Sequence, residues 1–506
     1  MSAEARFHAR ATRLFTCLRG AEVAFLSIEG ESTDFARFNH AKVRQAGHVD
    51  RERATVRLID GRRHASVTID LRGDGDDAHL LSALVEARGL VAGADEDPYL
   101  LYATAPGDTR RVESGALPTP AEIVASVAED AAGLDLVGIH ASGPVWRGLA
   151  TSLGHTHWHV VERFDAKVAA YLGGDRAVQT GLSGATWDRA RWRDALATAR
   201  THLAALERPR RALAPGRYRV FLTPTALNDL LAMMNWGGFS ARAGRTGASP
   251  LRRLAQGEVA LHPSVHLSED TARGWAPSFT DDGFVRPERV PLVTAGRHAG
   301  ELVSARTAGE FGLTPNGADP DESARSLALA PGDIPSADAL ARLGTGLWVG
   351  NLWYLNFSDR PAARVTGMTR FATFWVENGE IVAPVPVMRF DESLFRVFGD
   401  QLVGLTSESE ELPDTGTITT FAIINIPFAG QKIKPPYVAA YVLLDGADIP
   451  FLHLVTEVDA ADVRMGMRVK AVWKPEAERD FGIDNIDYFR PTGEPDAEYD
   501  TYKHHL

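Results

Sequence analysis

The stretch from Phe371 to Phe390 constrains the fold more than any other, because two apolar-rich runs flank the dipeptide Asn378-Gly379. This dipeptide is a strong short-range signal for a β-hairpin, since a type I′ turn requires positive φ at both central residues. Pro384 and Pro386 in the second run indicate an edge or a bend, because proline cannot donate to a sheet ladder. The sequence therefore predicts a hairpin whose second strand ends or bends at these prolines.

Length and composition indicate a multidomain globular protein. The chain has 506 residues, and at about 150 residues per domain this length predicts about three domains. Its 44% hydrophobic and 24% charged residues are typical of soluble proteins. The net charge of −12 makes a nucleic-acid backbone an unfavourable partner. The sequence contains no run of about 18 apolar residues, so it predicts no membrane span.

The N-terminus and the cysteine content bear on the compartment. Residues 1–20 carry charges throughout and no continuous apolar core, so they predict an amphipathic helix and no signal peptide. Cys17 is the only cysteine, which excludes an intrachain disulfide, a zinc ribbon and a CxxC redox pair. We therefore expect a cytoplasmic protein.

Hydrophobic periodicity and turn residues predict alternating helices and short strands before the hairpin. Helices are expected at residues 4–19, 76–93 and 187–206, from Thr119 to about 133, and from about Thr225 onward. Short strands are expected at 22–28, 35–39, 43–48, 54–60, 64–71, 136–142, 145–152, 155–161 and 218–222. Residues 94–118 are rich in proline, aspartate and glycine and predict a linker or loop.

The hairpin sequence Phe-x-Val-Glu-Asn-Gly-Glu-Ile-x-x-Pro-Val, from Phe374 to Val385, resembles a hallmark of the TldD/PmbA metallopeptidase family. Members of this family pair as TldD and TldE, also called PmbA, in an assembly that degrades peptides. Further family motifs are matched in the same order by Arg37–Gln45, Asp175–Val178 and the pair Gly184 and Trp187. The resemblance covers residues 1–411 and implies the multidomain α+β fold of the family.

The resemblance also identifies the helix that carries the metal ligands in zinc-binding members. In TldD-like members this helix follows a strand and holds His-Glu-x-x-x-His, whose histidines bind zinc and whose glutamate acts as general base. The equivalent segment here, Thr225–Gly238, contains Asn228 and Asp229 but neither histidine nor glutamate. The chain thus resembles TldE. We expect it to bind no cofactor itself, with zinc held by a TldD-like partner.

Three histidines at alternate positions, His155, His157 and His159, are the best remaining metal candidate, because alternate residues of a strand share one face. No cysteine, aspartate or glutamate lies nearby on that face. We therefore interpret the segment as a partly exposed strand whose histidines take part in packing, and assign no metal site to this chain.

Two arginines precede the hairpin, and two further histidines stand closer to the middle of the chain. In the family the region before the hairpin lines the cavity that holds peptide, so the resemblance implies that Arg364 and Arg370 bind peptide carbonyls or a C-terminal carboxylate. Solvated loop arginines are the alternative interpretation. His262 and His266 have i,i+4 spacing, but Pro263 disfavours a helix and predicts a loop.

A second resemblance begins near Pro413. Predicted strands at 417–428, 435–444 and 463–473, with the tail Phe489–Asp496, resemble the OB-fold of zinc-ribbon/OB proteins that accompany thiolases. The cysteine-rich ribbon of those proteins is absent. Family members of the TldD/PmbA type continue past Leu405–Glu410 with a final strand. Either the barrel strands take that place here, or the preceding domain has an open edge.

These observations predict an α+β, multidomain fold with an antiparallel β-rich C-terminal half of the TldD/PmbA type, followed by a small OB-type β-barrel. The expected domains are an α/β meander domain (1–95), a second α+β domain (96–214), the TldD/PmbA C-terminal domain (215–411) and an OB-fold domain (412–506). The leading function is a TldE-like subunit, non-catalytic on its own, in a TldD/TldE-type assembly acting on unfolded peptides. The alternative is an accessory protein that binds a thiolase-like protein of acyl-CoA metabolism through its OB-fold. An autonomous hydrolase is a third class, for which we find no nucleophile–base pair.

Overall fold

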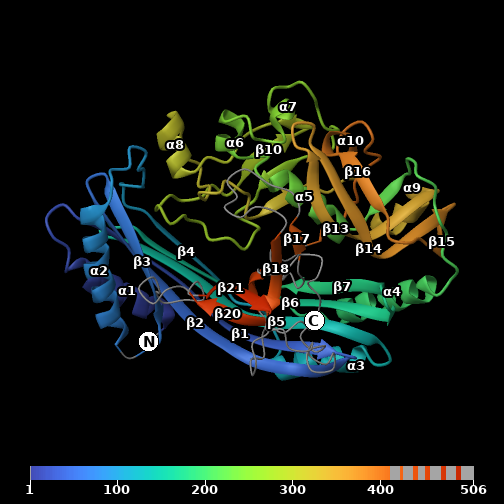
Figure 1. The fold of residues 1–506 in the computed structure, drawn as a ribbon, viewed down its shortest axis with the longest axis horizontal. Helices are drawn as coiled ribbons and strands as arrows, with labels where there is room; N and C mark the ends of the chain where they lie inside the picture. Colours follow the sequence, from blue (N-terminus) through green and yellow to red (C-terminus); the bar gives the residue numbers. More distant parts are fainter. Residues whose placement is uncertain are drawn as a thin grey trace. The chain divides into compact units, whose positions relative to one another are not determined.

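Figure 1 shows the computed structural model of the chain, which describes residues 2–73, 75–410 and the five strands 422–424, 437–442, 451–455, 469–473 and 486–491. The chain divides into two compact units, Met1–Pro413 and Asp414–Leu506. The first unit combines a long N-terminal sheet with a C-terminal part that contains two smaller sheets.

The N-terminal sheet is built mainly from long antiparallel strands. Its order is β3-β2-β1-β5-β6-β4, and β7 also pairs with β6. β4 runs parallel to β6, whereas the other pairs are antiparallel. The strands are β1 (Val23–Asn39), β2 (Lys42–Asp60), β3 (Arg63–Leu71), β4 (Asp108–Glu113), β5 (Asp135–Thr151), β6 (Thr156–Gly173) and β7 (Arg176–Gly184).

Several short strands predicted from the sequence are parts of these long strands. β1 continues without a break through residues 29–34, because most of these residues pair with both β2 and β5. β4 lies within the segment predicted as a linker or loop. Since β1 pairs with β5, residues 1–95 and 96–214, predicted as separate domains, contribute strands to one sheet.

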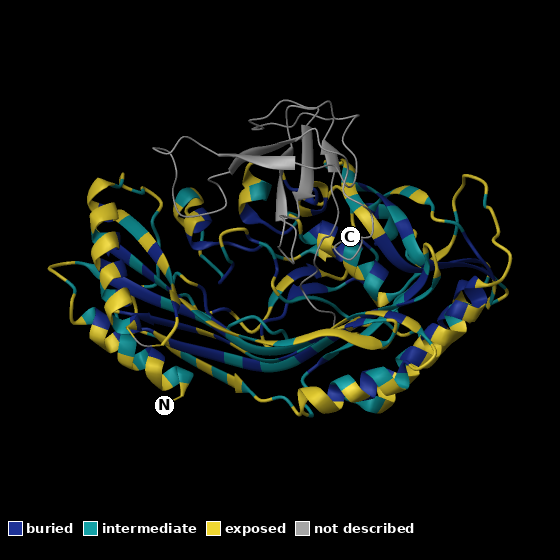
Figure 2. Cartoon of the chain, turned by 60° about the horizontal axis from the view of Figure 1, so that its bottom comes forward, coloured by how far each residue is buried: buried dark blue, intermediate teal, exposed yellow. Residues whose placement is uncertain are grey.

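Four helices cover one face of this sheet: α1 (Ala3–Phe15), α2 (Asp76–Gly93), α3 (Pro120–Asp130) and α4 (Arg189–Leu206). α1 and α2 pack on one end of the sheet, and α3 and α4 pack on the other. α3 begins as predicted, with Thr119 and Glu122 forming a capping box. Figure 2 shows exposed residues on the outer faces of the helices and buried residues along the strands.

The opposite face of the sheet is directed toward the C-terminal part. Along β6 the even-numbered residues Phe164, Ala166 and Val168 join the core with α3 and α4. Because successive side chains of a strand alternate between faces, the odd-numbered residues of β6 lie on the other side. This side includes Lys167 and Tyr171.

The C-terminal part of the first unit contains the predicted hairpin. Its five-stranded sheet has the order β15-β14-β13-β8, and β16 pairs with β14. Asn378 and Gly379 join β14 to β15 with φ of 51° and 83°, which confirms the predicted turn. The strands are β8 (Val220–Leu222), β13 (Gly346–Asp359), β14 (Arg364–Glu377), β15 (Glu380–Pro384) and β16 (Arg389–Ser393).

Shorter elements surround this sheet. A second sheet has the order β11-β10-β9-β12, and the largest hydrophobic core joins both sheets to α5. The elements are α5 (Pro224–Asn235), α6 (Ala241–Arg245), α7 (Arg252–Ala255), β9 (Leu267–Glu269), β10 (Val290–Thr294), β11 (Arg297–His298), α8 (Ala305–Phe311), β12 (Leu327–Leu329), the 3₁₀ helix η1 (Ser336–Asp338), α9 (Ala339–Leu343) and α10 (Leu394–Val397).

The second unit is described by its strands. They form one sheet of order β17-β18-β19-β21-β20, in which β19 and β21 are parallel. The strands are β17 (Ala422–Ile424), β18 (Tyr437–Val442), β19 (Phe451–Val455), β20 (Val469–Trp473) and β21 (Ile486–Pro491). The OB-type barrel stays a prediction, because much of the segment that it requires lies outside the described residues. Among the described helices, none has the length and apolar character that a membrane crossing requires.

Candidate functional site

α5 is the helix that the sequence comparison equates with the metal-binding helix of TldD-like proteins. It follows β8, and the Thr223 hydroxyl caps it by accepting a hydrogen bond from the backbone N–H of Ala226. Its apolar side chains, which include Leu230 and Met234, are buried in the core with β13. Within the described residues, no group of three or more histidine, cysteine, aspartate or glutamate side chains is placed to hold a metal ion.

Asp229 is the acidic residue of α5, and its surroundings are unusual for a carboxyl group. Burial raises the pKa of Asp229 to about 6, although a hydrogen bond from the backbone of Leu352 and the charge of Lys167 both act to lower it. Leu352 belongs to β13 and Lys167 to β6. Asp229 therefore lies near the junction of α5 with both sheets, and part of its population is protonated near pH 6.

Two direct contacts fix this junction. The Asn351 side-chain amide on β13 donates to Oε1 of Gln179 on β7, with 2.9 Å between nitrogen and oxygen. The rings of Phe371 on β14 and Tyr171 on β6 meet edge to face, with centroids 6.5 Å apart. The face of β13 and β14 that carries Asn351 is thus directed toward the odd-numbered face of β6.

Arg364 and Arg370, the predicted peptide-binding residues, both lie on β14 and share one face, because six residues separate them. Arg364 forms an ion pair with Asp391 on β16 at 2.8 Å. The guanidinium carbon of Arg370 lies 4.4 Å from the ring centroid of Trp353 and 4.8 Å from that of Phe371. The structure therefore distinguishes two arginines that the sequence treated alike.

The strands around Arg370 contain two aromatic residues in a backbone region that is rare for bulky side chains. Tyr354 and Phe371 have φ of 57° and 56°. Both stand where the β13–β14 register shifts. Tyr354 is 73% exposed and Trp353 is 44% exposed. Strained aromatic residues beside an arginine are a reason to consider this region functional.

The three histidines of the weak metal candidate are buried, so the expectation of a partly exposed strand is wrong. The ring of His157 stacks on Phe279, with centroids 5.0 Å apart, and Nε2 of His159 contacts the carbonyl oxygen of Trp275 at 3.1 Å. Burial lowers the pKa of His157 and of His159 to about 4 each, and lowers that of His155. Among the described residues, no hydrogen-bond partner is found for the buried Nε2 of His157 or for the buried Nδ1 of His159.

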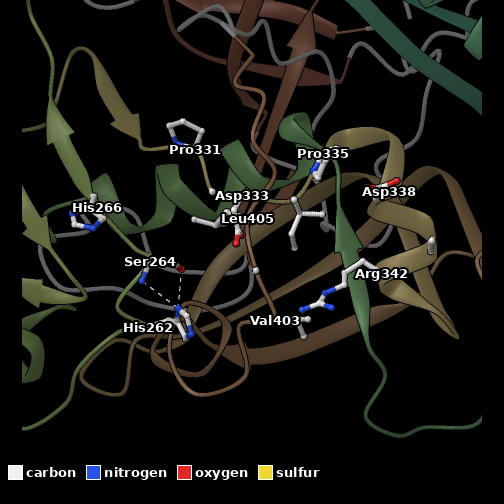
Figure 3. A pocket seen from close by; sticks show the side chains of 14 residues that line it. His262, Ser264, His266, Pro331, Asp333, Pro335, Asp338, Arg342, Val403 and Leu405 are labelled. Atoms are coloured by element: carbon white, nitrogen blue, oxygen red, sulfur yellow. Dashed lines mark hydrogen bonds between the residues drawn. The ribbon is translucent and has the colours of Figure 1, made fainter.

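Sequence reasoning missed a surface cavity of about 910 Å³ (Figure 3). Its lining comes from three separate segments, at 262–266, 331–342 and 403–405. His262 and His266 stand in the predicted loop, and Nδ1 of His262 lies 2.8 Å from the Ser264 hydroxyl oxygen. In Figure 3, Arg342 extends into the cavity from the side opposite these two histidines. No sequence pattern joins these segments, because only the fold brings them together.

Comparisons with known proteins agree with the fold. Residues 215–447 match the family model of the PmbA/TldA metallopeptidase C-terminal domain. The matched range continues past residue 411, where the sequence analysis ends this domain. No curated protein matches the chain.

Among solved structures, TldE from Thermococcus kodakarensis superposes with a TM-score of 0.66 at 13% identity, covering 81% of this chain and 96% of TldE. A modulator of DNA gyrase from Thermotoga maritima gives a TM-score of 0.64 at 15% identity, covering 78% of this chain and 93% of that protein. A modulator of DNA gyrase from Bacteroides thetaiotaomicron gives 0.62 at 14% identity, with coverage of 79% and 93%. The chain thus contains a PmbA/TldD-type domain within a mixed α+β fold of the TldD/TldE type.

Proposed function

We propose that this chain is a TldE-like subunit that pairs with a TldD-like zinc metallopeptidase and does not itself supply the zinc ligands. The observation that carries the proposal is α5: it follows β8 within the matched domain, yet it contains neither histidine nor glutamate. Leucine and methionine stand among its buried residues, and they cannot replace imidazole at a zinc site. The likeness to TldE supports the same assignment.

In this role the chain contributes one side of a site that receives unfolded peptides, and the partner provides the zinc-bound water. The face of β13 and β14 that carries Asn351 and is directed toward the long sheet is the part of the chain best suited to contact peptide. It carries exposed aromatic rings, and Asn351 and Phe371 join it to the long sheet. We expect the assembly to work in the cytoplasm.

The test is a reconstitution with a TldD-like subunit from the same host. The isolated chain should not cleave an unstructured peptide and should hold no stoichiometric zinc. The mixture should cleave the peptide, and a chelator should stop the cleavage. The matched control is a partner in which the glutamate of the His-Glu-x-x-x-His motif is changed to glutamine, which should pair with this chain but remain inactive. Chelator-sensitive cleavage by the isolated, repurified chain would overturn the proposal.

The alternative, an accessory role beside a thiolase-like protein, rests on the sequence of residues 413–506 alone. The domain match that continues to residue 447 favours the peptidase-related role, because it covers part of the segment assigned to the OB-fold. A binding assay between the full chain and a thiolase-like protein from the same host distinguishes the two. Tight binding there, without binding to a TldD-like subunit, would reverse the assignment.

A further inference from the structure

The arginines of this protein that stack on aromatic rings provide an internal comparison. In the described part of the chain, five such arginines also form an ion pair with a carboxylate: Arg57, Arg163, Arg211, Arg253 and Arg306. A sixth, Arg360, stacks against Trp236 and Phe357 and donates to the backbone carbonyls of Trp236 and Ala248. Stacking of arginine is thus accompanied by an acceptor for the guanidinium N–H groups.

Arg370 differs from these six. It has the same two-ring environment as Arg360, from Trp353 and Phe371, but no hydrogen bond or ion pair to its guanidinium is found among the described residues. A guanidinium that stacks on aromatic rings keeps its planar edge of N–H donors available and loses little conformational freedom when it binds. Arg370 is therefore a preorganised cation without an acceptor.

We infer that Arg370 binds the C-terminal carboxylate of a peptide, with Trp353 and Tyr354 contacting the side chains next to it. A carboxylate matches the paired N–H donors of a guanidinium and forms the strongest class of protein hydrogen bond. Trp353 and Tyr354 are exposed, so they can cover apolar groups of the ligand. The identity of the ligand as a peptide rests on the proposed function, whereas the carboxylate preference rests on Arg370 itself.

The position of Arg370 is better suited to binding an extended peptide than to binding the surface of a globular protein. Asn351 is the neighbour of Arg370 across the strand pair. The Asn351 side chain donates a hydrogen bond to Gln179 of the long sheet. Phe371, the next residue, touches Tyr171. Arg370 therefore lies close to where the two sheets meet, and an extended peptide reaches such a place more readily than a broad protein surface.

Arg364 supplies a matched control. It lies on the same strand and the same face as Arg370, but its guanidinium already forms an ion pair with Asp391. A ligand carboxylate would have to compete with Asp391 there. Replacing Arg364 changes the net charge of the face by the same amount as replacing Arg370, so the pair separates a local binding site from a general electrostatic effect.

The experiment measures binding of an unstructured hexapeptide ending in phenylalanine to the full chain by fluorescence anisotropy. We expect the free acid to bind roughly tenfold or more tightly than its C-terminal amide, the factor that a charge-assisted hydrogen bond provides. Arg370→Gln should remove this preference, Arg370→Lys should restore part of it, and Arg364→Gln should leave it unchanged. Near-ultraviolet circular dichroism checks that each variant is folded.

Three results would overturn the inference: equal affinity of acid and amide for the unaltered chain, loss of the preference in Arg364→Gln as well, or an Arg370→Gln variant that binds peptide normally but no longer pairs with a TldD-like subunit. The last outcome would assign Arg370 to a protein interface. A preference for the free acid in a chain that supports no zinc-dependent cleavage would instead refute the proposed function while leaving the carboxylate site intact.

Discussion

His157 leads to a quantitative prediction, because it is buried on β6 and its pKa is lowered to about 4 by burial. An unfolded histidine has a pKa of about 6.5, so between pH 6.5 and pH 4 the unfolded chain binds a proton that the folded chain does not. Stability from the neutral imidazole is therefore fully present above pH 6.5 and is lost as pH falls toward 4. From pH 7.5 to pH 5 this loss amounts to about 2 kcal/mol for His157.

The perturbation is His157→Gln, which removes the titrating ring and keeps a neutral polar group near the Thr109 hydroxyl that now contacts Nδ1 at 2.9 Å. The free energy of unfolding is measured with urea at pH 7.5, 6.0 and 5.0 by tryptophan fluorescence. We expect the variant to be less stable at pH 7.5, but to lose about 2 kcal/mol less than the unaltered chain on going to pH 5.

Two further histidines test whether the effect comes from burial. His140 and His159 are also buried, with pKa lowered to about 4 by burial, so His140→Gln should reduce the pH dependence by a similar amount. Parallel pH profiles for the unaltered chain, His157→Gln and His140→Gln would refute the reasoning.

Three other changes have expected outcomes. Burial raises the pKa of Asp229 to about 6, so the charged carboxylate lowers the stability of the fold as pH rises through 6. Asp229→Asn should therefore stabilise the fold by on the order of 1–2 kcal/mol at pH 7.5 but not at pH 4. Urea unfolding at the two pH values measures this difference. Glu322 is buried and accepts hydrogen bonds from the Ser240 hydroxyl and from two backbone N–H groups; Glu322→Gln should cost about 2 kcal/mol in thermal unfolding, whereas the exposed Glu258→Gln should cost little. A chain ending after residue 413, which lacks the final strand that the family resemblance implies, should aggregate in size-exclusion chromatography, and a monodisperse truncated chain would contradict this.

The features that the sequence predicted are those set by neighbouring residues. Asn378-Gly379 forms its turn because both residues adopt positive φ, which depends on these two residues more than on distant contacts. The start of α3 follows in the same way from Thr119, Pro120 and Glu122. Such signals need no knowledge of the rest of the chain.

The features that the sequence analysis missed depend on distant residues. Gly30 was taken as part of a break between strands, but β1 passes through it, and a side chain there would collide with the ring of Trp146 on β5. The histidines of β6 were expected to be partly exposed, but Trp275 and Phe279, more than a hundred residues later, cover them. Sequence periodicity shows which residues share a face, but not what packs against it.

The end of the PmbA/TldD-type domain can be argued in the same terms. Residues 332–336 and 405–408 are held together by backbone hydrogen bonds, by the bridge between Ile334 and Thr406, and by Glu408, which accepts from Ser336. The domain is therefore still forming contacts where the sequence analysis ended it, and the family match continues to residue 447. The match thus continues past the first compact unit, which ends at Pro413, into a segment that includes β17 and β18 of the second unit. Because β18 pairs with β19, a cut after residue 447 would divide the sheet of the second unit, so the truncation after residue 413 is the one that tests whether the first unit depends on the residues that follow it.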